Sequence, residues 1–341
     1  MRRAMLLLLM VLTVFSACAE GADWDFTGRA EIRDRDVTAF LEEIAAAPAG
    51  ARIELVGVKL SAAAQGKLVD ARPDLDFHWD VVFNGTKVDS DTTHLDLDKL
   101  ERKVGVKTLI AALKAMPKLT RVTMFNYRFS VKEMETVLAA YPDITFDWTV
   151  RVGNYLVRTD ATAFSTLKGR QDPRYTAKQL EPLKYCKDLV ALDFGHNNVN
   201  DLSFLTNWPH LKRLIIIDSK YPVTDLSPLA ELHELEYVEL FMQDITDLTP
   251  LANKPHLLDL NLCHNNVTDL TPLYTNTKLE RLWISYNKNL TEEEVAAFKA
   301  AVPGCQVETV EYQSTGAGWR EHPRYFIMAE SFKTRVYVPF E

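Results

Sequence analysis

The stretch Leu257–Leu273 reads LLDLNLCHNNVTDLTPL, and the spacing of its leucines decides the fold. Leucines at its first, fourth and sixth positions place one face of a short strand inward, because strand side chains alternate between two faces. The pair Thr268-Asp269 then supplies a side-chain oxygen cap, and Pro272 suits the start of a helical turn. The stretch therefore predicts a strand followed by a capped helical turn.

The same pattern recurs along the chain. Units open at Leu189, Leu211, Leu235, Leu257 and Leu279, so a 22-residue interval recurs and is lengthened once, between Leu211 and Leu235. The second half returns at 223–229 and 245–251, with a looser copy at 199–205. The ninth position holds Asn197, Asn265 and Asn287, whereas Ser219 and Gln243 take the other two places. An amide there can bond backbone groups that a tight coil leaves without ladder partners.

These units resemble the leucine-rich-repeat family, in its short 22-residue, internalin-type form. The resemblance covers Leu189–Leu290 strongly and Asp23–Ser165 weakly. It implies an α/β solenoid with a curved parallel sheet on the concave face and helices and short helical turns on the convex face. It also implies a binding role and does not identify the ligand.

An aspartate recurs before each helical turn, at Asp201, Asp225, Asp247 and Asp269. We interpret the four as caps rather than as a calcium column. One carboxylate per turn falls short of the six to eight oxygen ligands that calcium takes.

The N-terminal half carries a longer, 69-residue period. Leu68–Phe77 aligns with Val137–Phe146 at this offset, and Trp79 aligns with Trp148. Because 69 is three times 23, each block predicts three degenerate turns with helices near 38–47 and 108–116. The third strands are expected at 75–83 and 144–152, where the residues alternate as Phe-x-Trp-x-Val.

A single solenoid of about a dozen turns from Asp23 to Val310 is the economical interpretation of both periods. Its parts are degenerate, helix-containing repeats over 23–182 and regular repeats with a C-terminal cap over 183–310. The tail, 311–341, breaks the period and serves either as a packed cap or as a recognition segment.

Residues 1–19 have the order of a secretory signal. Arg2 and Arg3 precede an apolar run over 4–15 that is too short to span a bilayer, and small residues follow. Ala17-x-Ala19 suits ordinary signal peptidase. Ser16-Ala17-Cys18 resembles a bacterial lipobox, which implies lipidation at Cys18. The expected location is therefore extracytoplasmic, as a cell-membrane lipoprotein or a secreted protein.

Charge and composition exclude some partners. The 341 residues are 47% hydrophobic and 25% charged, which permits a sizeable core. The net charge of −8 becomes −10 without the signal, and no basic run marks a nucleic-acid site or membrane surface. We expect no nucleic-acid partner, and contact with a membrane only through an anchor at Cys18.

No motif for catalysis, a cofactor or a metal is present. The chain lacks Gly-x-Ser-x-Gly, His-Glu-x-x-His and phosphate-binding glycine loops, and its four cysteines form no Cys-x-x-Cys pair. His196 and His264 lie three turns apart, about 15 Å at strand spacing, which is too far to share a metal. Asp193, Glu239 and Asp259 on the concave strands leave one alternative: an enzyme, or enzyme-associated protein, acting on cell-wall polymer.

The outward strand positions predict a contiguous apolar and aromatic patch with a charged rim. The predicted binding residues are Arg213, Ile215, Ile217, Tyr237, Glu239, Phe241, Asp259 and Trp283. An apolar centre with a charged rim is typical of a protein interface, in which Trp, Tyr and Arg carry much of the energy. We expect a protein partner or a surface glycan there. The alternative is that the tail folds back and covers the patch.

Overall fold

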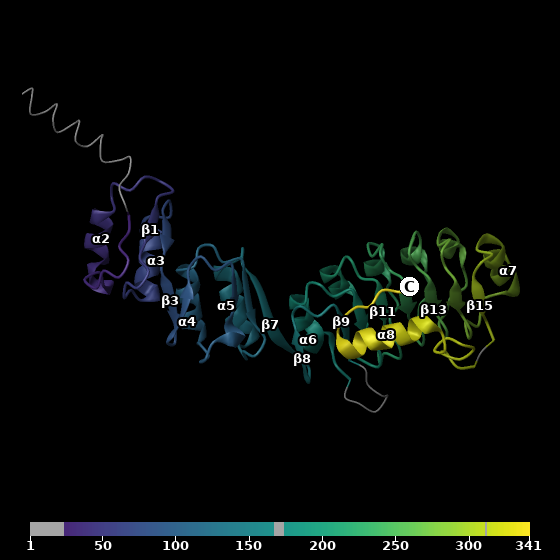
Figure 1. The fold of residues 1–341 in the computed structure, drawn as a ribbon. Helices are drawn as coiled ribbons and strands as arrows, with labels where there is room; N and C mark the ends of the chain where they lie inside the picture. Colours follow the sequence, from purple (N-terminus) through teal and green to yellow (C-terminus); the bar gives the residue numbers. More distant parts are fainter. Residues whose placement is uncertain (1–23, 167–173, 311) are drawn as a thin grey trace, which may run out of the picture. The chain divides into compact units, whose positions relative to one another are not determined.

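A computed structural model describes residues 24–166, 174–310 and 312–341, in two compact units, Met1–Trp148 and Thr149–Glu341 (Figure 1). The predicted signal and Cys18 lie outside the described residues. Among those described, no helix has the length and apolar composition to cross a bilayer.

The N-terminal unit alternates helices with short strands. Its helical elements are η1 (Asp34–Asp36), α2 (Val37–Glu43), α3 (Ala62–Ala71), η2 (Leu97–Lys99), α4 (Val106–Lys114) and α5 (Val131–Ala140). Its strands are β1 (Arg52–Glu54), β2 (Asp76–His78), β3 (Asp80–Phe83), β4 (Thr86–Asp89), β5 (His94–Asp96), β6 (Arg121–Met124) and the first half of β7 (Thr145–Val152).

The 69-residue period is visible in these elements. Helix α5 begins and ends 69 residues after α3, and α4 begins 69 residues after α2. Phe77 stacks on Trp79 at a ring-centroid distance of 5.0 Å, and the Trp79 indole N–H donates to the carbonyl oxygen of Ala115 at 2.8 Å. Both aromatic side chains are buried. The shared offset is thus a packing repeat, with aromatic residues at its core.

A β-hairpin replaces the third predicted turn of each block. Strand β3 pairs antiparallel with β4 across Asn84-Gly85. The second half of β7 pairs in the same way with β8 (Tyr155–Arg158) across Gly153-Asn154. Asn84 and Gly85 both have positive φ, as a two-residue hairpin turn requires. The expected single solenoid from Asp23 to Val310 is therefore wrong, because antiparallel hairpins interrupt the parallel stacking.

The C-terminal unit is a regular array of parallel strands and short helical turns. Its remaining strands are β9 (Ala163–Ser165), β10 (Ala191–Asp193), β11 (Arg213–Ile215), β12 (Tyr237–Glu239), β13 (Asp259–Asn261), β14 (Arg281–Trp283) and β15 (Gln306–Glu308). Its helical elements are α6 (Ala177–Leu180), η3 (Glu181–Tyr185), η4 (Ser203–Asn207), η5 (Ser227–Leu229), η6 (Thr249–Leu251), η7 (Thr271–Thr275), α7 (Glu292–Ala301) and α8 (Pro323–Thr334).

The seven strands β9 to β15 form one parallel sheet in chain order, with each strand in register one repeat from the next. Leu192 pairs with Leu214, Val238 with Leu260, and the leucines at the first, fourth and sixth positions are buried. The sheet begins at Ala163, before the predicted start of the regular repeats at 183. This is the leucine-rich-repeat solenoid that the sequence predicts.

Side-chain amides and carboxylates close the turns. Asn265 accepts a hydrogen bond from the Ile245 amide at 3.0 Å and donates to the carbonyl oxygens of Leu240 and Leu262. The four recurring aspartates each accept a bond of 2.8 Å from the amide two residues further on; these amides belong to Ser203, Ser227, Thr249 and Thr271. The capping interpretation is thereby confirmed.

Candidate functional site

The C-terminal tail lies on the concave face of the solenoid. Helix α8 packs on outward residues of the strands, contacts β9 and β10, and runs along the sheet in Figure 1. The buried cluster beneath it combines outward strand residues with three tail residues, Trp319, Met328 and Phe332. Tyr325, Tyr337 and Phe340 of the tail pack against the same cluster. The tail is therefore a packed cap.

Trp319 anchors the cap at the middle of the sheet. Its side chain is fully buried, and its ring lies 5.5 Å from Tyr237 and 5.1 Å from Trp283 between centroids. Its indole N–H donates to Glu239 at 2.9 Å, and its carbonyl oxygen accepts from Arg281 at 3.2 Å. The aromatic strand residues thus have an aromatic partner within their own chain.

Arg213 binds the end of the tail. Its guanidinium donates to the Val338 carbonyl oxygen at 2.6 Å and to the Ser331 hydroxyl at 3.2 Å. It also lies over the rings of Phe340 and Tyr337, at 3.7 and 4.4 Å from their centroids. The tail therefore surrounds this charge in place of solvent, with a carbonyl oxygen, a hydroxyl and two aromatic rings.

A buried ionic cluster fixes the start of α8. Asp259 lies 2.5 Å from Arg281 and 2.7 Å from Arg324, and Arg324 also contacts Glu280 at 2.7 Å. Asp259 is fully buried, so its charge is compensated by two guanidinium groups rather than by water.

These contacts correct the expectation of an exposed patch. All eight predicted binding residues are buried: Arg213, Ile215, Ile217, Tyr237, Glu239, Phe241, Asp259 and Trp283. The physical reason is that the tail brings aromatic rings to the apolar centre and hydrogen-bonding partners to the rim. The alternative, a tail folded over the patch, describes the structure.

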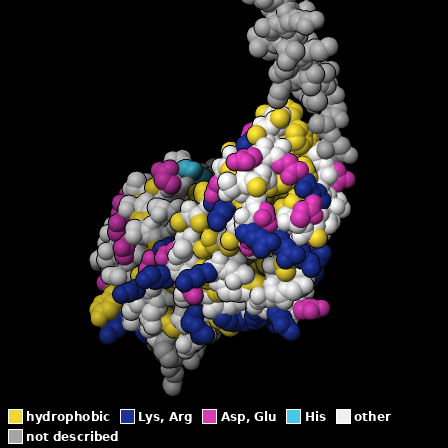
Figure 2. Space-filling view, turned by 90° about the vertical axis from the view of Figure 1, so that its left-hand side faces the viewer, with side chains coloured by type: hydrophobic (Ala, Val, Ile, Leu, Met, Phe, Trp, Pro, Cys, Tyr) yellow, Lys and Arg dark blue, Asp and Glu magenta, His cyan; other side chains and the backbone are white. Residues whose placement is uncertain are grey.

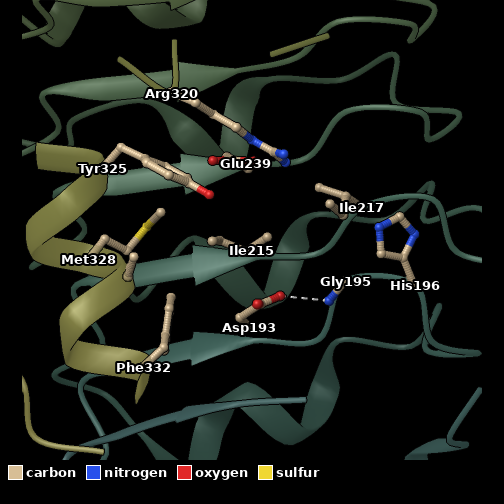
Figure 3. A pocket seen from close by; sticks show the side chains of 11 residues that line it. Asp193, Gly195, His196, Ile215, Ile217, Glu239, Arg320, Tyr325, Met328 and Phe332 are labelled. Atoms are coloured by element: carbon tan, nitrogen blue, oxygen red, sulfur yellow. Dashed lines mark hydrogen bonds between the residues drawn. The ribbon is translucent and has the colours of Figure 1, made fainter. Parts of the chain in front are cut away.

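The cap leaves one cavity of about 300 Å³ open on the concave face. Asp193, Ile215 and Glu239 of adjacent strands form its floor, and α8 forms one wall (Figure 3). Its lining comprises Asp193, Gly195, His196, Ile215, Ile217, Glu239, Arg320, Tyr325, Met328, Ala329 and Phe332. Three of the eight predicted residues, Ile215, Ile217 and Glu239, therefore face a ligand-sized space.

Two buried carboxyl groups line this cavity. Asp193 accepts hydrogen bonds from the Ser165 hydroxyl at 2.6 Å and the Gly195 amide at 2.8 Å. Glu239 accepts from Tyr237 and Trp319. Burial raises the pKa of both carboxyl groups, and these hydrogen bonds act against the rise.

One cationic side chain, that of Arg320 in the tail, lines the cavity. The exposed Arg320 extends toward Glu239 in Figure 3, and its charge acts against the rise in pKa that burial causes in Asp193 and Glu239. His196, at the opposite side, bonds Asp218 through Nδ1 at 2.9 Å. The site therefore combines an apolar floor, two buried acids and a long cationic side chain at its rim.

The sequence prediction omits the α8 side of this cavity. Tyr325, Met328 and Phe332 recur at helical spacing, i, i+3 and i+7, which is the signal of an apolar helix face. Asp193 is predicted only as part of the alternative enzyme site, and His196 is considered only as a metal ligand. The spacing of apolar residues in the tail predicts an apolar helix face, but it does not indicate which surface that face covers.

The cysteines offer no reactive thiol in the described chain. Cys186 and Cys263 are buried and Cys305 is partly buried, all three as free thiols. Cys263 is fully buried and belongs to the cluster that the tail covers. Burial raises the pKa of its thiol to about 12, which disfavours the nucleophilic thiolate.

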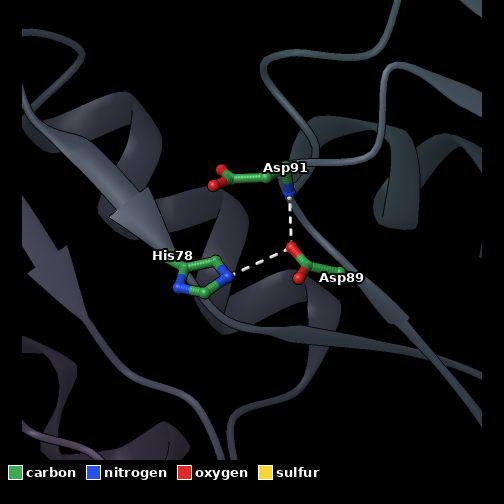
Figure 4. A group of neighbouring side chains, drawn as sticks. All are labelled: His78, Asp89 and Asp91. Atoms are coloured by element: carbon green, nitrogen blue, oxygen red, sulfur yellow. Dashed lines mark hydrogen bonds and ion pairs between the residues drawn. The ribbon is translucent and has the colours of Figure 1, made fainter.

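One group in the N-terminal unit has the composition of a metal site. Donor atoms of His78, Asp89 and Asp91 lie within 4.8 Å of one another (Figure 4). Both Asp91 oxygens already contact cations, Arg52 and Lys118, each at 2.8 Å. A metal ion would have to displace these two charges, so we interpret the group as part of an ion-pair network.

Figure 2 shows one face of the molecule, on which Lys and Arg side chains lie among Asp and Glu side chains.

Comparison with known proteins gives structural neighbours only. No family model matches the chain, and no curated protein matches its sequence. An internalin C2 from Listeria monocytogenes is 22% identical, with a TM-score of 0.33, over 48% of this chain and 80% of that one. An internalin from the same species is 16% identical, with a TM-score of 0.31, over 78% and 70%. A leucine-rich-repeat protein of Leptospira interrogans is 14% identical, with a TM-score of 0.38, over 76% and 72%.

At these identities and TM-scores the likeness carries no argument about function, and the fold assignment rests on the register of the chain's own strands. By that register the C-terminal unit is a leucine-rich-repeat solenoid, and the solved structures to which the chain is similar are bacterial internalins and leucine-rich-repeat proteins.

Proposed function

We propose that the chain is a non-enzymatic, extracytoplasmic binding module that recognises a protein, or a surface glycan, through the concave face of its repeats. The observation that carries the proposal is the open cavity beside α8, with isoleucines and two acids on its strand side and a cationic side chain at its rim. A concave, mostly apolar site with a few placed polar groups is the usual form of a recognition pocket. The extracytoplasmic location rests on the order of residues 1–19.

The eight predicted binding residues divide into two roles in this proposal. Ile215, Ile217 and Glu239 line the cavity and would contact the partner directly. The others, Arg213, Tyr237, Phe241, Asp259 and Trp283, hold the tail in place, so they would shape the wall of the site without touching the partner.

The test is capture of surface proteins and envelope glycans from the source cells by the full chain. Ala329, on α8, lines the cavity and is partly exposed, so Ala329→Trp would fill the cavity without changing charge. We expect this variant to lose a partner that the wild type retains, by about tenfold or more in affinity, while Ala329→Ser retains it. A partner held equally by both variants would contradict the proposal. A glycan retained in place of a protein would identify the second kind of partner.

A second candidate, an enzyme acting on cell-wall polymer, is favoured by one observation. Two buried acids, Asp193 and Glu239, face a single cavity, burial raises the pKa of both, and glycoside hydrolysis uses a pair of carboxyl groups. Against it, Glu239 is held by Tyr237 and Trp319 under the cap. Hydrolysis of envelope glycans by the wild type that disappears in Glu239→Gln would establish the enzyme and overturn the binding proposal.

Anchoring through Cys18 is a separate part of the proposal. The intact mass of the protein from the membrane fraction should show a diacylated cysteine at the mature N-terminus. An unmodified chain beginning at Glu20 would instead identify a secreted protein.

A further inference from the structure

The two buried acids of the cavity differ from the other buried acid of the concave face. Asp259 has two arginine partners, Arg281 and Arg324, at ion-pair distance. Among the described residues, Asp193 and Glu239 have only neutral hydrogen-bond donors at that distance. A buried carboxylate without a cation is costly, because the low-dielectric interior does not replace its hydration.

The register of the strands places both acids in the lining of one cavity. Asp193 pairs with Ile215 across β10 and β11, and Ile215 pairs with Glu239 across β11 and β12. The acids therefore flank an isoleucine at the same level of the sheet, about two strand spacings or 10 Å apart. Ile217 and Met328 extend this apolar floor toward the mouth and α8.

A long aliphatic stem with a cationic end suits this arrangement. The stem of an arginine or lysine would lie on Ile215 and Ile217, and its charged end would compensate the two acids. Arg320 already places one guanidinium at this cavity, and its charge acts against the rise in pKa that burial causes in both Asp193 and Glu239. Arg320 makes no ion pair within 4 Å in the described chain, and its side chain is exposed.

We propose that the cavity is a cation-recognition site that takes an arginine or lysine side chain of the protein partner between Asp193 and Glu239. This inference rests on the proposed function and names the partner's chemistry. Arg320 competes with the incoming side chain, so it acts as a weak internal occupant of the same charge. The net charge of −10 in the chain without its signal also favours a basic partner surface.

The test uses two capped tripeptides, Ala-Arg-Ala and Ala-citrulline-Ala, which differ in charge and hardly in shape. Binding to the full chain is followed by the methyl resonance of Met328 in the cavity wall, assigned with Met328→Leu. We expect the arginine peptide to bind about tenfold more tightly than the citrulline peptide, since each loses similar surface to solvent and only one brings a charge.

Matched variants locate the charge effect. Asp193→Asn and Glu239→Gln should each remove most of the preference for arginine. Each keeps one acceptor oxygen, which can hold the Gly195 amide in the first variant and the Tyr237 and Trp319 donors in the second. Glu231→Gln, at an exposed carboxylate of another turn, should leave the preference unchanged. Arg320→Gln should tighten binding of the arginine peptide several-fold, because it removes a competing positive charge.

Equal affinities for the two peptides, or no binding of either, would overturn the inference. So would a preference for arginine that survives both carboxamide variants. Partner capture that is lost in Ala329→Trp but unchanged in Asp193→Asn and Glu239→Gln would leave the proposed function standing and remove only the cationic ligand. Partner capture that is unchanged in all three variants would contradict both the cationic ligand and the proposed function.

Discussion

Arg213 has no exposed surface, although it occupies an outward strand position next to the apolar patch. Burial lowers the pKa of its guanidinium, and one carbonyl oxygen, a hydroxyl and two aromatic rings of the tail surround it. The residue types at these positions therefore form a contact surface, whereas the sequence analysis predicts an exposed patch. Their partner is the tail of the same chain, and residue identity alone cannot distinguish a segment of the chain from a second molecule.

The Asp259 cluster gives a stability prediction at this scale. Asp259→Ala leaves Arg281 and Arg324 buried without their shared counter-charge, so we expect a loss of about 3–5 kcal/mol in the free energy of unfolding. Urea denaturation followed by tryptophan fluorescence measures it. Glu181→Ala, which breaks the exposed pair with Lys184, should cost no more than about 1 kcal/mol. Equal effects of the two substitutions would show that the Asp259 cluster is not buried.

His78 gives a pH prediction in the N-terminal unit. Burial opposes its charged form, but hydrogen bonds to Glu54 and Asp89 prevail and raise its pKa above 6.5. A histidine with a raised folded-state pKa stabilises the fold below the unfolded pKa, and this contribution is lost as pH rises through the folded pKa. Unfolding free energies measured from pH 6 upward, to about pH 8, should therefore fall less in His78→Gln than in the wild type.

The control for this experiment is His256→Gln, at an exposed histidine of the other unit. Its profile should follow that of the wild type over the same range. If His78→Gln also follows the wild type, the network with Glu54 and Asp89 does not form in solution.

At the scale of elements, local patterns predict some features well and miss others. Leucine spacing and aspartate caps predict strands β10 to β14 and their turns because both depend only on contacts within a repeat. The hairpins are missed although Asn84-Gly85 is a strong two-residue turn signal, because the 69-residue period divides evenly into turns of repeat length. The apolar face of α8 can be predicted from the sequence. The surface on which α8 docks cannot, because the contacts join residues that lie more than a hundred positions apart in the chain.

The tail cap can be tested through its central aromatic residue. Trp319→Ala removes the ring that contacts Tyr237 and Trp283 and leaves a void above the sheet. We expect a loss of about 3–5 kcal/mol in the free energy of unfolding and increased binding of a hydrophobic dye to the native protein. Tyr312→Ala, at an exposed tail residue, should change stability by less than about 0.5 kcal/mol. An unaltered stability of Trp319→Ala would show that the cap does not form.

At the scale of the whole molecule, length and acidic charge are compatible with one long solenoid. The described chain instead divides near Trp148 into two units, each with its own buried core. Only the second unit has the uninterrupted parallel sheet, and its tail occupies much of the concave face. We therefore expect a partner to bind at the cavity that remains open, rather than across the whole concave surface.

Photocrosslinking in the source cells tests this claim most directly. A benzophenone amino acid replaces His196 at the mouth of the cavity in one full-length variant, and Thr206 on the exposed side of the η4 turn in the other. We expect a discrete partner adduct at position 196 and none at position 206, with the adduct at 196 lost when Ala329→Trp is added. An adduct at position 206 alone, equal adducts at both positions, or none at position 196 would contradict it.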